Sequence, residues 1–93
     1  KSRQQVVFVD MEAGISLKIM SPEQVLEECQ VSKVKLPGKK DPFVVLKNHA
    51  SLISALNPGT IEYVTADGQT RELQVKSGFV EVKDNKVSVC VEL

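Results

Sequence analysis

The sequence of 93 residues has no tryptophan, a single histidine and only two cysteines. Acyl transfer requires a nucleophile, a base and an acid held together. Ser51 and Ser54 follow His49 closely, but no Gly-x-Ser-x-Gly turn holds either serine. Cys29 and Cys90 lie far apart and do not form a Cys-x-x-Cys pair, so with one histidine they do not make a tetrahedral metal site. Because glycine-rich phosphate-binding motifs are also missing, we expect no enzyme, metal or cofactor.

Neither sign of charge is in excess, because 12 basic residues balance 12 acidic ones. A dedicated nucleic-acid-binding domain usually has a basic excess. The aromatics that could stack on bases are few and scattered: Phe8, Phe43, Tyr63 and Phe79. No apolar run approaches the roughly 20 residues of a membrane-spanning helix, and no signal peptide is recognisable.

The small number of cysteines restricts the compartments in which the protein is expected. Small secreted domains usually carry several cysteine pairs, so two reduced thiols in a cytosolic protein are the simpler interpretation. A disulfide between Cys29 and Cys90 remains open from the sequence.

β-branched residues are abundant, with 15 valines and four isoleucines against four alanines. These side chains fit a pleated surface, and a chain of this length makes one domain. Apolar and polar residues alternate over residues 15–20, 61–64, 80–83 and 87–93. Asp67-Gly68 and Asp84-Asn85 predict tight turns, and Ser77-Gly78 is expected to break a run. The pattern is typical of a β-sandwich or barrel.

Three stretches are less regular. The spacing of Val31 and Val34 predicts a bulge, and residues 43–46 (FVVL) read as a strand buried on both faces. Residues 52–56 (LISAL) fit a helical turn or an extended edge equally well. In residues 1–10, the apolar run 6–9 (VVFV) is equally compatible with an edge strand and with a disordered N-terminal segment.

Lysines concentrate in residues 33–47, where only Asp41 opposes them. They are Lys33, Lys35, Lys39, Lys40 and Lys47. One interpretation is a solvated sheet edge, where lysine prevents strand-to-strand aggregation. The alternative is an electrostatic contact with an acidic partner, an anionic lipid surface or RNA.

Five short segments follow one another in a recognisable order: residues 19–23 (IMSPE), 34–38 (VKLPG), 43–50 (FVVLKNHA), 56–59 (LNPG) and 77–82 (SGFVEV). Together they resemble the N-terminal domain of the epsilon subunit of F-type ATP synthase, called delta in mitochondria. The resemblance covers residues 15–93, and residues 1–14 are expected to be an extension or a remnant.

The resemblance implies an all-β fold, a flattened two-sheet β-sandwich or barrel of about eight to ten short strands. It also resolves one local conflict. Ser21 and Pro22 are helix-start signals, which would give a helix to about Cys29. In the family residues 22–28 are extended and pair in the sheet, and we adopt that expectation because tertiary pairing overrides weak propensity.

The resemblance implies a non-catalytic subunit of the central stalk. Such a subunit links the gamma subunit to the membrane c-ring and supports proton-coupled ATP synthesis or hydrolysis, at the cytoplasmic face of the bacterial inner membrane. The expected partners are these two components, without nucleic acid and without a membrane span; self-association of the isolated domain stays open. The family's inhibitory C-terminal helical hairpin has no counterpart in the sequence, so we expect no regulation of that kind.

By position, the resemblance implies interface roles for two loops. Residues Lys39, Lys40, Asp41 and Pro42 are expected near the ring, and His49 and Ser51 near the gamma subunit or the ring. The family often reads Leu-Pro-Gly-His-Ala-Pro where this chain has residues 46–51 (LKNHAS). A different class also fits the residues alone: a free-standing small β-barrel that binds RNA or peptide.

Overall fold

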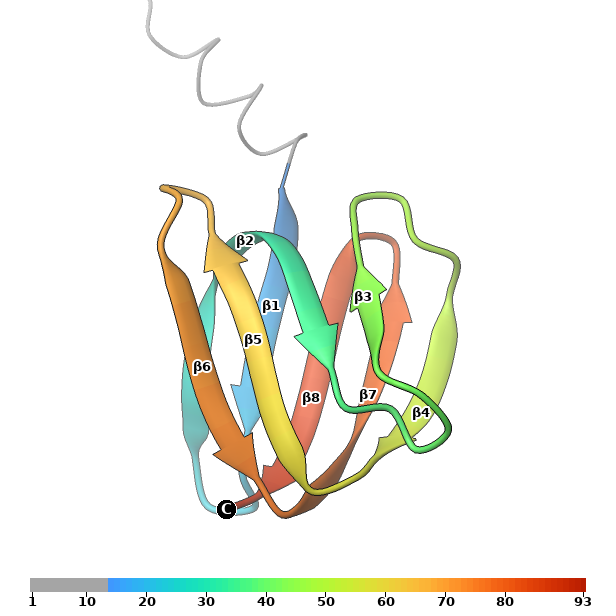
Figure 1. Ribbon diagram of the computed structural model, residues 1–93. Coiled ribbons are helices and arrows are strands. Elements are labelled where there is room, and N and C mark those ends of the chain that lie inside the picture. The colour runs from blue at the N-terminus through green and yellow to red at the C-terminus, as the bar shows by residue number, and fades with distance from the viewer. Residues whose placement is uncertain (1–13) are drawn as a thin grey trace, which may run out of the picture.

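The computed structural model describes residues 14–93, and every regular element in that range is a β-strand (Figure 1). The all-β prediction is therefore confirmed. In chain order the eight strands are β1 (Ile15–Met20), β2 (Val25–Leu36), β3 (Phe43–Val45), β4 (Leu52–Leu56), β5 (Gly59–Thr65), β6 (Thr70–Val75), β7 (Ser77–Lys83) and β8 (Lys86–Glu92).

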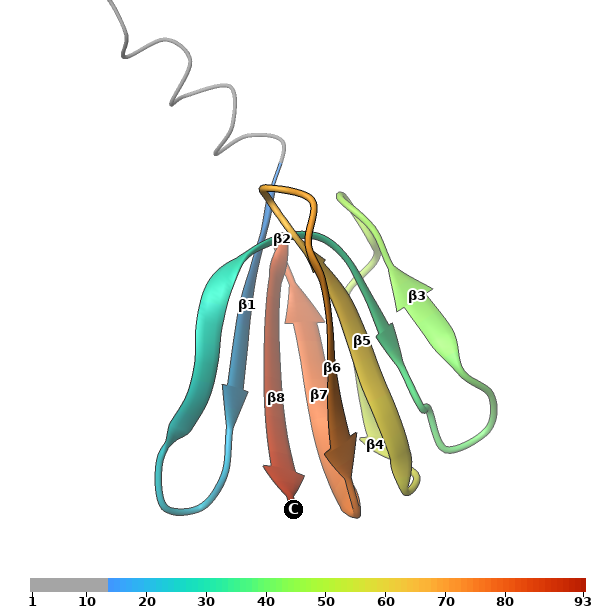
Figure 2. The ribbon, with the colours of Figure 1, turned by 60° about the vertical axis from the view of Figure 1, so that its left-hand side comes forward.

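Seven strands form one continuous sheet in the order β4-β7-β8-β1-β2-β5-β6. Strand β3 lies outside this order and pairs with β2. Neighbouring strands are antiparallel except β1 and β8, which run parallel. The last of the eight strands, β8, therefore lies between β7 and β1. The sheet curls over into two facing layers, so that it resembles a half-barrel (Figure 2).

Strand β2, with 12 residues, connects the two layers. Its first half pairs with β1, and its second half pairs with β5 and β3. The register against β5 shifts between Val31 and Lys33, so the bulge predicted there is confirmed. A bulge bends a strand and increases its twist, which lets one strand pass from one layer to the other.

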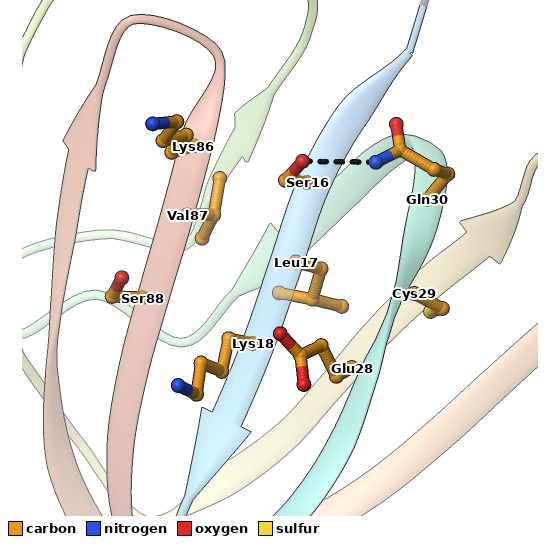
Figure 3. A pocket seen from close by; sticks show the side chains of 9 residues that line it. All are labelled: Ser16, Leu17, Lys18, Glu28, Cys29, Gln30, Lys86, Val87 and Ser88. Carbon is orange, nitrogen blue, oxygen red and sulfur yellow. Dashed lines mark hydrogen bonds between the residues drawn. The ribbon is translucent and has the colours of Figure 1, made fainter. Parts of the chain in front are cut away.

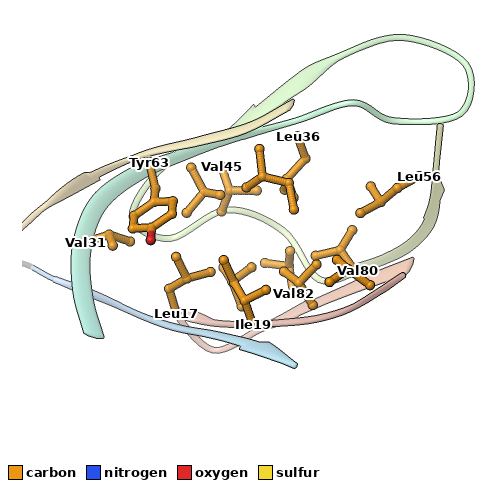
Figure 4. Close-up of a cluster of buried hydrophobic side chains, with 14 of the residues drawn as sticks. Leu17, Ile19, Val31, Leu36, Val45, Leu56, Tyr63, Val80 and Val82 are labelled. Carbon is orange, nitrogen blue, oxygen red and sulfur yellow. The ribbon is translucent and has the colours of Figure 1, made fainter. Parts of the chain in front are cut away.

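The core lies between the layers, as the period-two alternation predicts. Leu17 and Val80 from one layer face Val45 and Tyr63 from the other (Figure 4). Each of these side chains is at most 5% exposed. Full burial of a valine or leucine side chain contributes about 1.5–3 kcal/mol, so this layer of aliphatic side chains supplies the main stabilisation of the sandwich.

One corner between the layers is closed by backbone hydrogen bonds. Gly38 forms an isolated bridge with Leu56. The Lys39 amide donates to the Ala55 carbonyl oxygen at 3.0 Å, and the Asn57 amide donates to the Pro37 carbonyl oxygen at 2.8 Å. The loop after β2 is thereby fixed to the end of β4.

The two predicted tight turns are confirmed. Asp84 and Asn85 both have positive φ, 52° and 61°, as a type I′ hairpin turn requires, whereas in the other turn Gly68 alone is left-handed, with φ 93°. The hydroxyl of Thr65 donates to the Asp67 carboxylate, which lowers the pKa of that exposed carboxyl group.

Residues 43–46 are not buried on both faces, so that prediction is wrong. Val45 is buried, but Val44 and Leu46 are 42% and 54% exposed. The reason is that β3 has only three residues and, within residues 14–93, pairs with β2 alone. Its outer face meets no further layer.

From Val25 on, the segment after β1 is extended and paired, as the family resemblance implies, whereas residues 22–24 lie in the turn before it. Val25 pairs with Met20, and the ladder continues to Val31. The helix-start signals form a turn instead: the Ser21 hydroxyl accepts from the amides of Glu23 and Gln24, both at 3.3 Å. Residues 52–56 adopt the extended alternative, as β4. The expectations for residues 1–13 lie outside the described residues.

The break predicted at Ser77-Gly78 falls instead at Lys76, because both residues belong to β7. Gly78 sits against β8. A Cβ atom there would overlap the Cys90 carbonyl oxygen and lie 3.0 Å from the Val91 Cα atom. Only glycine permits this approach of the two backbones. Strand β8 also ends at Glu92, so Leu93 is not part of the alternation and is 56% exposed.

We expect Gly78→Ala to lower the free energy of unfolding by about 2 kcal/mol, because β7 must shift away from β8. The matched control is Gly68→Ala, where a Cβ atom meets nothing within 4 Å and the left-handed φ alone costs about 1 kcal/mol. Urea denaturation measures both values. Equal losses in the two variants would show that the close approach at Gly78 has no energetic weight.

Candidate functional site

The loop with Lys39, Lys40, Asp41 and Pro42 joins β2 to β3 and is exposed. The Asn57 side-chain amide donates to the Lys39 carbonyl oxygen at 3.0 Å, in addition to the backbone bonds of the closed corner. The loop backbone is therefore fixed while its charged side chains face solvent. We call residues 39–42 the charged loop.

His49 and Ser51 lie in the loop between β3 and β4, at the opposite end of the sandwich from the charged loop (Figure 1). The His49 amide donates to the Leu46 carbonyl oxygen at 3.1 Å, and its Nδ1 atom lies 2.7 Å from the Ala50 carbonyl oxygen. His49 is half-buried, and Ser51 is exposed. The structure thus separates the two groups of predicted interface residues.

The lysine-rich stretch does not form one basic patch. Lys33 and Lys35 point outward from β2, and Lys35 stands opposite Glu62 of β5. Lys47 lies in the loop with His49, away from Lys39 and Lys40. The five cations are therefore spread over a sheet face and both ends of the domain.

An exposed apolar row crosses the outer face of the other layer, and the sequence analysis missed it. The strand registers align Ala55 of β4 with Phe79 of β7, Cys90 of β8, Met20 of β1 and Val25 of β2. Each of these residues occupies a position whose side chain faces away from the core. The sequence hinted at the row, because each strand has an apolar residue where the alternation predicts a polar one. That the five residues line up can be seen only once the pairing register of the strands is known.

This row is named here the outer apolar row. Its residues Ala55, Phe79 and Val25 are exposed, and Met20 and Cys90 are half-buried. Phe79 is 53% exposed and Val25 is 48% exposed. Ile53, the next outward residue of β4, is 75% exposed. A shallow hollow of about 590 Å³ lies at the row, lined in part by Ala55, Phe79 and Cys90. Contiguous exposed apolar surface of this kind makes the row a candidate binding surface.

The same face is polar toward its other end, where a hollow of about 470 Å³ lies over β1, β2 and β8 (Figure 3). Ser16, Lys18, Glu28 and Ser88 line it, and the Gln30 side-chain amide donates to the Ser16 hydroxyl at 2.9 Å. Within residues 14–93, no three or more His, Cys, Asp or Glu side chains are grouped to hold a metal ion.

The two cysteines are free thiols on opposite sides of the sheet. Cys29 stands opposite the buried Leu17 and packs against the core, whereas Cys90 belongs to the outer apolar row. Burial, together with a hydrogen bond to Glu27 and the charge of that carboxylate, raises the pKa of Cys29 to about 11. The disulfide left open by the sequence is not formed.

The fold defines the class of the protein: an all-β sandwich that exposes an apolar row on one layer and a charged loop at one end. The chain belongs to the family of the ATP synthase delta/epsilon chain β-sandwich domain, whose family model matches residues 14–93.

Among its relatives is the ATP synthase epsilon chain of Nitratidesulfovibrio vulgaris Miyazaki F, 40% identical over 82 residues, which are 88% of this chain and 60% of that protein. The epsilon chain of Syntrophomonas wolfei is 33% identical over 81 residues, 87% of this chain and 59% of that protein. This chain thus spans about 60% of the length of these relatives.

The fold is similar to that of solved ATP synthase chains. A chain of the mitochondrial enzyme of Euglena gracilis matches with a TM-score of 0.80 and 21% identity, over 85% of this chain and 51% of that one. A chain from the central stalk and c-ring of the Tetrahymena thermophila enzyme matches with a TM-score of 0.73 and 14% identity, over 85% and 63%. None of these comparisons favours the RNA-binding alternative. In the described part of the chain, no helix has the length and hydropathy to cross a bilayer.

We expect Cys29 to react with alkylating reagents about a hundredfold more slowly at pH 8 in the folded chain than in urea, because a pKa near 11 leaves about one thiol in a thousand ionised. The rate should rise about tenfold per pH unit until pH approaches that pKa. The variant Cys90→Ser isolates the Cys29 signal for mass spectrometry. Similar rates in the folded and unfolded chains would contradict the raised pKa.

Proposed function

We propose that the chain is a central-stalk subunit of an F-type ATP synthase, which links the gamma subunit to the c-ring and supports proton-coupled ATP synthesis or hydrolysis. The observation that carries the proposal is the outer apolar row in a member of the epsilon family. Residues 15–93 form the domain with this role in the proposal, and residues 1–14 are an extension or a remnant. The domain takes part in no bond-breaking step and sits peripherally, at the cytoplasmic face of the bacterial inner membrane.

The gamma subunit binds the outer apolar row in this proposal. The row spans five strands, so a helix or extended segment of gamma laid across them contacts several exposed apolar side chains at once. Burial of apolar area is the main favourable contribution to such contacts, and large aromatic side chains carry most of the affinity. Phe79 is the aromatic residue of the row.

The c-ring binds the charged loop in this proposal. Loops of a membrane ring that project into water are polar, and a fixed backbone with mobile lysines suits a polar, salt-sensitive contact. Lys39 and Lys40 outnumber Asp41, so the facing ring loops should carry acidic side chains. The charged loop adjoins the Ala55 end of the outer apolar row, because the Lys39 amide donates to the Ala55 carbonyl oxygen, so the two partners bind at neighbouring sites in this proposal.

Stiffness is the property that the fold contributes to this role. Hydrogen-bonded ladders connect β4 to β6 without a break, through β7, β8, β1, β2 and β5. A force on the outer apolar row is therefore transmitted to the other layer through backbone hydrogen bonds and a packed core.

We expect Phe79→Asp to lower affinity for the gamma subunit at least tenfold, because a desolvated carboxylate replaces the aromatic contact. Stability should fall by about 1 kcal/mol, because aspartate is disfavoured in a strand and Phe79 is only 53% exposed. The matched control is Val44→Asp, an exposed apolar residue outside the outer apolar row. Copurification of the assembled enzyme and titration with purified gamma measure the effect.

Failure of the unmodified chain to recover gamma would contradict the proposed function. Equal affinities of the Phe79→Asp and Val44→Asp variants would instead leave the function standing and reject the outer apolar row as the gamma contact.

We expect the double variant Lys39→Glu, Lys40→Glu to weaken binding to the ring about tenfold at low salt, and less at high salt because counterions screen exposed charges. Proton-driven ATP synthesis in reconstituted vesicles should fall in parallel. The matched control is Lys33→Glu, Lys35→Glu, the same change of charge on the outer face of β2. Unchanged synthesis in the charged-loop variant would exclude the electrostatic contact.

A further inference from the structure

The outer apolar row is too narrow to form a stable interface by itself. One residue from each of five strands makes a strip about 7 Å wide and about 24 Å long, from the spacing of residues and strands in a sheet. The strip covers roughly 170 Å² of the sheet, whereas a stable contact usually buries about 800 Å² on each partner. A protein that binds the row therefore also covers the surface beside it.

The sheet extends mainly to one side of the row. On the other side, β1 has already ended at Met20 and β2 begins at Val25, both of which belong to the row, and β8 continues for only two residues. Toward the opposite end of the layer, β7 runs on from Phe79 to Lys83, about 13 Å along the strand. The hollow of about 470 Å³ over β1, β2 and β8, called the polar hollow below, lies on this side.

The polar hollow gathers two cations and a hydroxyl group. Lys18, Lys86 and Ser88 all line it. Lys18 stands beside Ser88 in the parallel pairing of β1 and β8, and Lys86 is two residues before Ser88 on the same face of β8. Strand spacing and rise per residue place the Cα atoms of Lys18 and Lys86 about 8 Å apart. One carboxylate can therefore lie between the two ammonium groups and accept from the hydroxyl as well.

The carboxylates of the domain leave this point open. Glu28 stands opposite Lys18 in the register, but the Lys18 side chain extends toward β8 and away from Glu28 (Figure 3). Glu81 is the other carboxylate among the outward strand positions on this side of the row. Lys83 and Lys86 stand directly opposite each other, and like charges so placed repel. Three cations thus face two carboxylates, and a further carboxylate from a partner relieves the repulsion.

We propose that the polar hollow binds an acidic side chain of the gamma surface that covers the outer apolar row, with its carboxylate between the ammonium groups of Lys18 and Lys86. This inference rests on the proposed function, because gamma is the protein assigned to the row. It specifies the chemistry of the gamma surface: apolar side chains over the row, and an aspartate or glutamate about 10 Å further along the strands. An interface that is apolar at one end and charged at the other also fixes which way round gamma lies on the sheet.

The first test is a zero-length crosslink in the complex of the full chain with purified gamma. A carbodiimide joins an amine to a carboxylate only where the two groups touch. We expect mass spectrometry to find amide bonds from Lys18 or Lys86 to an aspartate or glutamate of gamma. Lys33 and Lys35, on the outer face of the other layer, should form none. A crosslinked complex in which neither Lys18 nor Lys86 is joined to gamma would overturn the inference.

The second test removes the two charges and keeps the length of the side chains. We expect the double variant Lys18→Gln, Lys86→Gln to bind gamma about tenfold more weakly at low salt and to differ less from the unmodified chain at high salt. The matched control is Lys33→Gln, Lys35→Gln, which should bind as the unmodified chain does. Urea denaturation should give the same midpoint for both double variants, so that lost affinity does not reflect unfolding.

The outcomes separate this inference from the proposed function. Equal affinities of the two double variants, in a complex that Phe79→Asp still weakens, would reject the acidic contact and leave gamma on the outer apolar row. An unmodified chain that does not bind gamma would contradict the proposed function and this inference together.

Discussion

Strand β2 is the constraint on which the rest of the structure depends. It is the one strand of the eight that pairs with β1 in one layer and with β3 and β5 in the other. The bulge between Val31 and Lys33 sets the point at which it crosses. A one-residue slip of pairing would turn every side chain of a strand to the opposite face. The registers that follow from β2 therefore determine both what is buried and which residues line up in the outer apolar row.

The sequence was informative wherever the physical signal is local. The valine-rich alternation predicted the strands. The pairs Asp67-Gly68 and Asp84-Asn85 predicted the turns, because glycine and asparagine tolerate positive φ. The register mismatch at Val31 was visible as a break in the period. These features depend on residues within a few positions of one another.

What the sequence could not provide depends on which strands become neighbours. The outer apolar row takes one residue from each of five strands, and no single strand shows it. The exposure of Val44 reflects the position of β3 on the edge of β2 rather than its composition. The separation of the charged loop from His49 follows because β3 lies between them. The family resemblance predicted interface residues only by their position along the chain. The fold determines which of these residues lie on the same surface.

The position of β8 has a consequence for how the domain forms during synthesis. β8 is the last of the eight strands to leave the ribosome, yet it occupies the gap between β7 and β1. Until Glu92 has emerged, the paired strands β4 and β7 have no ladder to β1, and β7 and β1 each keep an unpaired edge. Pairing between distant parts of a chain is slow to form and leaves edges open to aggregation. The ladder between β7 and β1 can therefore be completed only after the other seven strands have been synthesised.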